Sequence, residues 1–320
     1  MDGEAWHALL SGRFDAAERD DWLIALRAAA PHWTWWSDGD AGLPRQQIRA
    51  AVVANPAPGA LAGLPRLGLV QSLWAGVEKL LADSSVPAGV PLARLVDPAM
   101  SAAMAETALW AVLSLQRGFF GYAAQQSVGC WAQQAQRRAD ELSVLVLGLG
   151  AMGSSVAERL AAQGWRVSAW HATPRRRALA GSVSAHAGPV ALAALLPGSQ
   201  VVVNLLPLTA ATRGLLDERF FAALPRGAGI VNLARGAHLV EADLIAALDS
   251  GQLGHAVLDV FETEPLPAAH RFWRHPRVTV LPHVAALSDP RSAAKLVAAN
   301  LEALRDGAPL AHLVDRERGY

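Results

Sequence analysis

A glycine-rich turn constrains this chain more than any other feature. The apolar run Val144–Leu147 leads into Gly-Leu-Gly-Ala-Met-Gly at 148–153, and a helical pattern follows directly. A strand, a Gly-x-Gly-x-x-Gly turn and a helix in this order are typical of a dinucleotide-binding site. Free N–H groups and the positive dipole end of the helix would bind the phosphates. The residues predicted to bind the pyrophosphate are Gly148, Gly150, Ala151, Met152 and Gly153.

The residues after the second predicted strand, Arg166–Trp170, indicate which dinucleotide is bound. An NAD site usually has Asp or Glu about 20 residues beyond the first glycine, where it bonds the ribose 2′-hydroxyl. Here residues 171–177 contain no carboxylate but three arginines, and arginine binds phosphate through paired charged hydrogen bonds. We therefore predict that NADP(H) is preferred and NAD(H) possible, although residues 175–177 would also suit a solvated helix start. The predicted cofactor residues here are His171, Thr173, Arg175 and Arg176.

Length and composition narrow the class of protein. A chain of 320 residues, 52% of them hydrophobic, suggests two domains with large cores. The formal net charge of zero argues against nucleic-acid binding, which needs clustered Lys and Arg. The single cysteine, Cys130, suits a reducing compartment. With an acidic N-terminus and no apolar run of about 18 residues, we expect a cytoplasmic protein with no signal peptide or membrane span.

Strand-length and helical patterns alternate along the chain. In the first hundred residues short strands alternate with helices; we predict a helix at Ala17–Ala30 and strands at Ala50–Ala54, Leu67–Gln71 and Leu92–Val96. A single long helix, Met100–Gln126, is expected to lead into the dinucleotide unit, whose further strands are Gln200–Leu205, Ala228–Leu233, Ala256–Val260 and Val278–Leu281. The last helix, Pro290–Asp306, should return to the first domain. The predicted fold class is α/β, with two doubly wound parallel-sheet domains, a Rossmann domain and a flavodoxin-like catalytic domain, and a cleft between them.

Polar residues follow three of these predicted strands. The carboxyl ends of parallel strands share one edge, so Arg235, Asp259, Glu264 and His283 should converge near the glycine turn. Such a set suits reduction of a 2-oxo acid, because hydride transfer to a carbonyl creates an alkoxide that needs a proton. We expect His283 to donate that proton and Glu264 to hold its imidazole. Asp259 would either bond the nicotinamide carboxamide or orient Arg235.

Two groups are expected to bind the substrate carboxylate. Arg235 would pair with it and polarise the carbonyl oxygen. In the first domain, Trp74-Ala75-Gly76-Val77 runs from a strand end into a helix start, which offers backbone N–H groups to an anion, although it would equally be a plain connection. His270 and His275 have no third ligand at a metal-like spacing, so no metal is predicted.

These motifs together resemble the D-isomer-specific 2-hydroxyacid dehydrogenases, and within them the glyoxylate/hydroxypyruvate reductase A branch. The resemblance rests on five segments in the same order, 148–153, 204–207, 232–236, 258–267 and 282–286. It implies a homodimer, a discontinuous catalytic domain of residues 1–99 and 286–320, and a dinucleotide-binding domain of residues 100–285. It places the catalytic Arg, Glu and His on Arg235, Glu264 and His283. Further cofactor contacts are implied at Leu206, Pro207, Leu233, Ala234 and Asp259.

The resemblance implies NADPH-dependent reduction of glyoxylate to glycolate and of hydroxypyruvate to glycerate. Two alternatives remain open from the residues. One is a reductase of a bulkier 2-oxo acid, and the divergent N-terminal segment around Asn55-Pro56 does not transfer the family's substrate specificity. The other is a protein that senses NAD(P) on the same fold without turnover.

Overall fold

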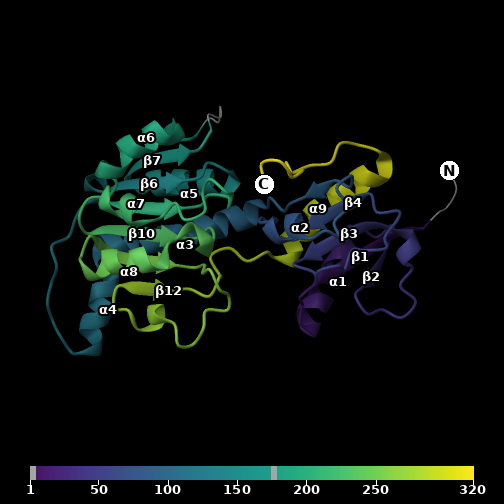
Figure 1. Ribbon diagram of the computed structural model, residues 1–320, viewed down its shortest axis with the longest axis horizontal. Helices are drawn as coiled ribbons and strands as arrows, with labels where there is room; N and C mark the ends of the chain where they lie inside the picture. Colours follow the sequence, from purple (N-terminus) through teal and green to yellow (C-terminus); the bar gives the residue numbers. More distant parts are fainter. Residues whose placement is uncertain (1–4, 174–178) are drawn as a thin grey trace. The chain divides into compact units, whose positions relative to one another are not determined.

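The computed structural model describes residues 5–173 and 179–320, which form two compact units (Figure 1). The first unit contains the chain up to Ala99 together with Ser288–Tyr320, and the second contains Met100–Leu287. The sequence places the second boundary two residues earlier, after residue 285. Arg175 and Arg176, two of the predicted cofactor residues, lie outside the described residues. The cleft expected between the domains stays a prediction.

The first unit is built on a five-stranded parallel sheet. Its strands lie in the order β2-β1-β3-β4-β5, the 2-1-3-4-5 order of flavodoxin-like folds. The helix α9 packs against α1 and β4, so the C-terminal segment completes this unit (Figure 1). The elements are β1 (Trp6–Gly12), α1 (Ala16–Ala29), β2 (Trp33–Ser37), η1 (Arg45–Gln47), β3 (Ile48–Ala54), β4 (Leu69–Ser72), α2 (Glu78–Ala82), β5 (Leu92–Ala93) and α9 (Pro290–Asp306).

Two strands of this sheet, β1 and β2, were not predicted from the sequence. The internal strand β1 is rich in Ala and Leu, which suit a helix as well as a strand. The edge strand β2 does carry a signal, because Trp33, Trp35 and Ser37 are buried and alternate with more exposed residues. The predicted third strand, Leu92–Val96, is only the two-residue β5.

The second unit is built on a seven-stranded parallel sheet in the order β12-β11-β10-β9-β6-β7-β8. Numbered from β6, this is the 3-2-1-4-5-6 order of a Rossmann fold with one further strand. Both units are therefore doubly wound parallel-sheet domains, which confirms the predicted fold class. The elements are α3 (Pro98–Arg117), α4 (Phe119–Ser127), η2 (Ala139–Glu141), β6 (Ser143–Leu147), α5 (Ala151–Ala161), β7 (Arg166–His171), β8 (Ser184–Ala187), α6 (Gly188–Leu195), η3 (Leu196–Gly198), β9 (Val201–Asn204), α7 (Glu218–Ala222), β10 (Ala228–Asn232), η4 (Gly236–His238), α8 (Glu241–Asp249), β11 (Leu253–Leu258), η5 (Arg271–Arg274) and β12 (Val278–Val280).

The long helix predicted at residues 100–126 is wrong in one respect, because it is two helices. Gly118 has a φ of +69°, a left-handed conformation that ends α3 and starts α4. By length and composition α3 would be able to cross a membrane. Its most apolar stretch of 18 residues has a mean hydropathy of 1.2, and 44% of that stretch is buried inside the protein. Its buried residues Met104, Ala108 and Val112 pack in the core of the second unit, as a soluble core helix would. The absence of a membrane span stays a prediction.

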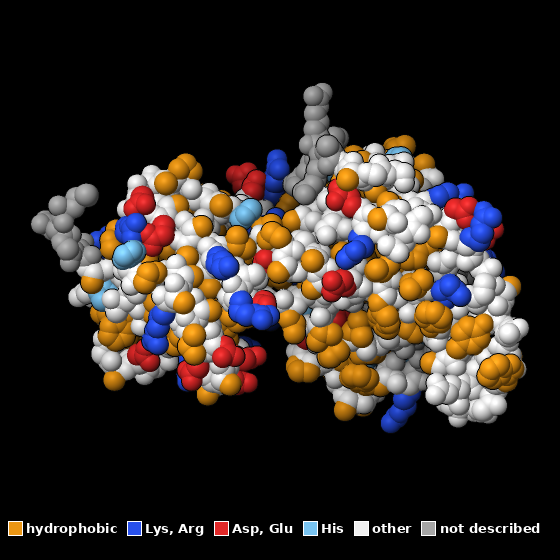
Figure 2. Space-filling view, turned by 180° about the vertical axis from the view of Figure 1, so that it is seen from behind, with side chains coloured by type: hydrophobic (Ala, Val, Ile, Leu, Met, Phe, Trp, Pro, Cys, Tyr) orange, Lys and Arg blue, Asp and Glu red, His pale blue; other side chains and the backbone are white. Residues whose placement is uncertain are grey.

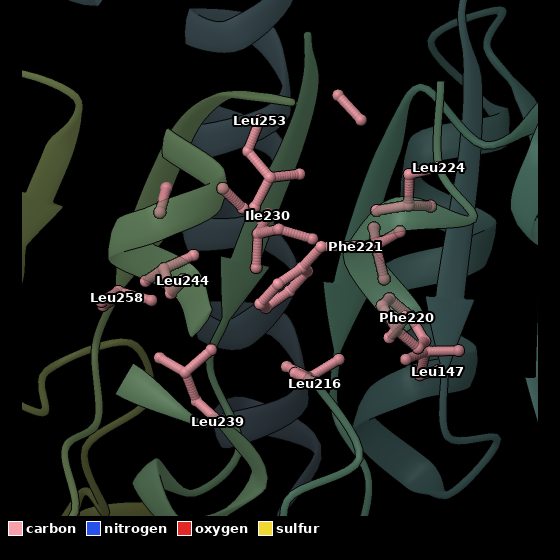
Figure 3. Close-up of a cluster of buried hydrophobic side chains, with 14 of the residues drawn as sticks. Leu147, Leu216, Phe220, Phe221, Leu224, Ile230, Leu239, Leu244, Leu253 and Leu258 are labelled. Atoms are coloured by element: carbon pink, nitrogen blue, oxygen red, sulfur yellow. The ribbon is translucent and has the colours of Figure 1, made fainter. Parts of the chain in front are cut away.

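The core of the second unit lies on both faces of its sheet. Successive residues of a strand point to opposite faces, so Leu145 and Leu147 join one hydrophobic cluster while Val144 and Val146 join the other. The first cluster includes side chains from α7 and α8, such as Phe221 and Leu244, which meet Ile230 of β10 (Figure 3). Helices α3 and α5 cover the second cluster. Burial on both faces explains why these strands are almost wholly apolar until their last residues.

Candidate active site

The strands of the second unit end together at one edge of the sheet. A single row of paired residues crosses it, consisting of Trp170, Leu147, Asn204, Asn232, Leu258 and Val280. Beyond this row the chain leaves the sheet, and the predicted site residues lie in those departing segments. Gly148 follows β6, Asp259 follows β11 and His283 follows β12 within three residues.

The glycine turn after β6 has the geometry expected of a dinucleotide site. Gly148 has a φ of +102°, and a Cβ there would lie 2.6 Å from the carbonyl oxygen of Leu205. A Cβ on Gly153 would overlap the carbonyl oxygen of Gly148, so this glycine lets α5 pack against the turn. A Cβ on Gly150 would meet no atom within 4 Å, which leaves open space beside the backbone. The turn therefore fits a bound pyrophosphate. The amides of Ala151 and Met152 lie at the N-terminus of α5, where helix N–H groups are available to an anion.

His171 stands where an NAD site usually has a carboxylate. It is the last residue of β7 and is 9% exposed. Its Nδ1 is buried and finds no hydrogen-bond partner among the described residues. A buried polar atom without a partner is costly unless another group meets it, so this nitrogen fits a site that a ligand completes. Thr173, two residues on, is exposed.

Glu264 and His283 form a close pair at this edge. The Nδ1 of His283 lies 2.8 Å from Oε2 of Glu264, and Oε1 of Glu264 accepts a hydrogen bond from the Phe261 N–H at 2.9 Å. Burial alone would raise the pKa of Glu264, but these hydrogen bonds and the charges nearby hold that pKa below its ordinary value of 4.5. The carboxylate is therefore ionised near neutral pH and accepts from Nδ1–H, so Nε2 is the ring nitrogen of His283 that Glu264 does not bind.

Asp259 holds the backbone on which His283 stands. His283 has a φ of +57°, a left-handed conformation that is uncommon for residues other than glycine. Its N–H donates to the carbonyl of Asp259 at 2.9 Å, and the carboxylate of Asp259 accepts from the N–H groups of Val284 and Ala285 at 2.7 and 3.0 Å. Burial raises the pKa of Asp259 despite these two bonds. Its predicted role toward nicotinamide or Arg235 stays a prediction, and its visible role is to fix the loop of His283.

Arg235 lies in the segment that follows β10, where this segment passes close to the backbone after β11. A Cβ on the next residue, Gly236, would overlap the backbone of Phe261, so the two loops are in direct contact there. The guanidinium of Arg235 donates to the carbonyl of Ala234 at 2.6 Å, and its charge contributes to the lowered pKa of Glu264. The structure thus brings Arg235, Glu264 and His283 to one edge of the second unit. Leu206, Leu233 and Ala234 are buried beside them.

A buried polar network beneath this edge was not predicted from the sequence. Asn204, Asn232 and His238 are all fully buried, and the amide nitrogen of Asn204 bonds both of the others. Asn204 and Asn232 end two neighbouring strands of valine and isoleucine, where a polar residue without exposure is unusual. That pattern was a usable signal. His238 gave no such signal, because it lies in the short helix η4 and not at the end of an apolar strand.

The remaining predicted residues divide between site and scaffold. Trp74–Val77 belongs to the first unit, where it follows β4 and precedes α2, and the N–H of Trp74 is held by Ser72 Oγ at 3.0 Å. His270 bonds Glu241 and His275 bonds Asp249, so the two imidazoles serve separate pairs. Within residues 5–173 and 179–320, no group of three or more His, Cys, Asp or Glu side chains is placed to hold a metal ion.

Curated relatives of known name match almost the whole chain. The glyoxylate/hydroxypyruvate reductase A of Serratia proteamaculans is 43% identical over 302 residues, which cover 89% of this chain and 96% of the relative. The enzyme of the same name from Yersinia enterocolitica is 40% identical and covers 95% of this chain and 97% of its own length.

Solved structures agree with these relatives. A D-isomer specific 2-hydroxyacid dehydrogenase from Xanthobacter autotrophicus Py2, in complex with NADPH and MES, has a TM-score of 0.93 at 40% identity and covers 99% of this chain and 100% of its own. An NADPH-dependent glyoxylate/hydroxypyruvate reductase from Sinorhizobium meliloti, in complex with NADP and sulfate, has a TM-score of 0.90 at 34% identity, covering 98% and 100%. A family model described as D-isomer specific 2-hydroxyacid dehydrogenase, NAD binding domain, matches residues 109–285. The chain therefore belongs to the D-isomer specific 2-hydroxyacid dehydrogenase family.

Proposed function

We propose that this chain is an NADPH-dependent reductase of small 2-oxo acids, which converts glyoxylate to glycolate and hydroxypyruvate to glycerate. The observation that carries the proposal is the 2.8 Å pair of His283 and Glu264 on the sheet edge that also holds the glycine turn. Relatives named glyoxylate/hydroxypyruvate reductase A, at 39–43% identity, support the choice of substrate. We place the enzyme in the cytoplasm, where the exposed thiol of Cys130 would stay reduced.

The residues of the edge then have distinct tasks. When bound, NADPH would supply the hydride that attacks the 2-carbonyl carbon. Arg235 would bind the substrate carboxylate and draw electrons toward the carbonyl oxygen. His283 would pass the proton on Nε2 to that oxygen, so the 2-oxo acid gains a hydride and a proton and becomes a 2-hydroxy acid. Glu264 would keep Nδ1 protonated and balance the charge of the imidazolium before transfer. The backbone amides at 75–77 are proposed as a further group for the carboxylate.

Replacing His283 tests the proton donor. His283→Gln removes the acid, while Asp259 still holds the backbone of the loop. We expect kcat with glyoxylate and NADPH to fall roughly 100- to 10,000-fold, the range of general acid catalysis, with the Kd for NADPH unchanged. Steady-state absorbance at the NADPH band and fluorescence titration measure the two quantities. His275→Gln is the matched control. Turnover at the wild-type rate would remove His283 as the acid.

The lowered pKa of Glu264 predicts how stability depends on pH. A carboxyl whose folded pKa lies below its unfolded value of 4.5 contributes stability above that value and loses it as pH falls through the folded pKa. At neutral pH the wild type should therefore have a larger free energy of unfolding than Glu264→Gln, and this difference should disappear below about pH 4.5. Urea denaturation of both proteins across this range measures the difference, with Glu262→Gln as a charge-matched control. A difference independent of pH would contradict the ionised pair.

The arginines after His171 predict the preference between cofactors. We expect NADPH to bind more tightly than NADH, because the 2′-phosphate would meet Arg175 and Arg176. The double variant Arg175→Ala, Arg176→Ala should reduce the preference for NADPH, measured as the Kd for NADH divided by the Kd for NADPH. The expected reduction is roughly 10- to 100-fold, as for lost charged hydrogen bonds. Calorimetric titration with each cofactor provides the ratio, and Arg166→Ala serves as a control. An unchanged ratio would place the phosphate elsewhere.

We propose that the second unit forms a homodimer through the face of α3, α4 and the segment that follows them. Figure 2 shows hydrophobic side chains gathered on this side of the second unit. Its exposed apolar residues are Trp110, Leu113, Phe119, Val128 and Trp131, the last 95% exposed. Exposed apolar surface of this kind favours burial against a partner. Sedimentation should give a dimer for the wild type and a monomer for Trp131→Glu with Val128→Glu. Val190→Glu, on the exposed side of α6, should stay dimeric, and a monomeric wild type would refute the proposal.

A further inference from the structure

We propose that His238 is a positioning residue that links the loop after β9 to the backbone of Arg235. The inference rests on the proposed function, since it assigns Leu206-Pro207 to the cofactor and Arg235 to the substrate. His238 is fully buried at the end of η4, three residues after Arg235. It has no part in the proton transfer described above, yet both of its ring nitrogens are engaged. Because both nitrogens of this buried imidazole are bonded, His238 fixes the positions of the groups that it contacts.

The contacts of His238 determine its tautomer. Asn204 Oδ1 accepts from the N–H of Leu206 at 3.2 Å, which turns the Asn204 amide nitrogen toward His238. That nitrogen lies 3.0 Å from Nδ1 of His238, and because an amide nitrogen only donates, Nδ1 is the acceptor. Nε2 lies 3.2 Å from the carbonyl oxygen of Pro207, which only accepts, so Nε2 carries the proton. His238 is therefore a neutral ring that needs one donor and one acceptor.

One arm of the network reaches the cofactor loop. Nε2 of His238 holds the carbonyl of Pro207, which also accepts from Thr212 Oγ1 at 2.7 Å. Asn204 holds the N–H of Leu206, so the loop is fixed at two consecutive residues. This loop lies against the glycine turn, because the carbonyl oxygen of Leu205 would be 2.6 Å from a Cβ on Gly148. A shift of Pro207 would therefore change the surface offered to the dinucleotide.

The other arm reaches Arg235. The amide nitrogen of Asn204 also donates to Oδ1 of Asn232 at 3.0 Å. Asn232 in turn donates from Nδ2 to the carbonyl of Arg235 at 3.0 Å and accepts from the N–H of Ala234 at 3.3 Å. Arg235 is thus oriented through its backbone by a chain of bonds that ends on Nδ1 of His238. Catalytic groups misplaced by about 1 Å lose large factors in rate, so both arms bear on turnover.

Two substitutions separate the arms. The side-chain oxygen of His238→Asn can take the place of Nδ1 and still accept from Asn204, but it does not reach Pro207. The amide nitrogen of His238→Gln can take the place of Nε2 and still donate to Pro207, but Asn204 loses its acceptor. We expect His238→Asn to raise the Kd for NADPH about tenfold with little change in the KM for glyoxylate. We expect His238→Gln to raise the KM for glyoxylate about tenfold with little change in the Kd for NADPH.

The measurements distinguish positioning from other roles. NADPH fluorescence gives Kd without turnover, and steady-state rates give KM and kcat across pH. Because His283 is intact in both variants, the pH profile of kcat should keep its wild-type shape. His255→Gln, at a partly buried histidine that bonds Thr279, should leave both constants at wild-type values. Variants that unfold at lower temperature while Kd and KM stay at wild-type values would show a purely structural role and overturn the inference.

A measurement on the wild type covers the case in which a variant does not fold. In the ¹⁵N spectrum, the ring of His238 should appear as a neutral ring with a proton on Nε2 and none on Nδ1. The addition of NADPH should change the chemical shifts of its ring nitrogens. A doubly protonated ring, or shifts that ignore NADPH, would overturn the inference. If the wild type binds NADPH but reduces neither glyoxylate nor hydroxypyruvate, the proposed function fails, while the NADPH arm of the test still decides the role of His238.

Discussion

The parallel register of the second sheet is the constraint on which the site depends. Its paired row brings the last residues of β6, β9 and β10 side by side, so the loops after them leave from one edge. The pairing of Asn232 with Leu258 adds β11 to the same row. A slip of one residue on any strand would turn its side chains to the other face and displace the group that follows it. The segments that carry Glu264 and His283 therefore leave the sheet from one edge, above a core of valines and leucines.

This dependence explains which parts were predictable. Strands buried on both faces are apolar to their ends, so a polar residue after such a run marks the edge, and Arg235, Asp259 and His283 follow that rule. The break at Gly118 was not predicted, because a single glycine is tolerated inside a helix and the flanking residues keep the helical spacing. The role of His238 was not predictable, since its partners come from two other segments whose loop paths decide the contact.

Asp259 shows how a correct location can carry an unexpected role. The sequence places it at the edge and suggests nicotinamide or Arg235 as its partner. In the structure its two carboxylate oxygens meet consecutive backbone amides, and those amides are aligned because His283 adopts a left-handed conformation. Few non-glycine residues adopt this conformation, and although histidine does so more often than most, the sequence alone does not predict it here. Burial raises the pKa of Asp259, while the hydrogen bonds from the two amides favour its charged form.

The left-handed turn has a further consequence for the chemistry. A non-glycine residue in that conformation costs about 1–2 kcal/mol, and here three hydrogen bonds to Asp259 offset the cost. All three come from backbone N–H groups at 283–285, so none depends on the imidazole. The orientation of the imidazole is set separately, by the hydrogen bond between its Nδ1 and Glu264. Asp259 thus holds the backbone of residues 283–285 and Glu264 holds the side chain of His283, so a substitution can disturb one without removing the other.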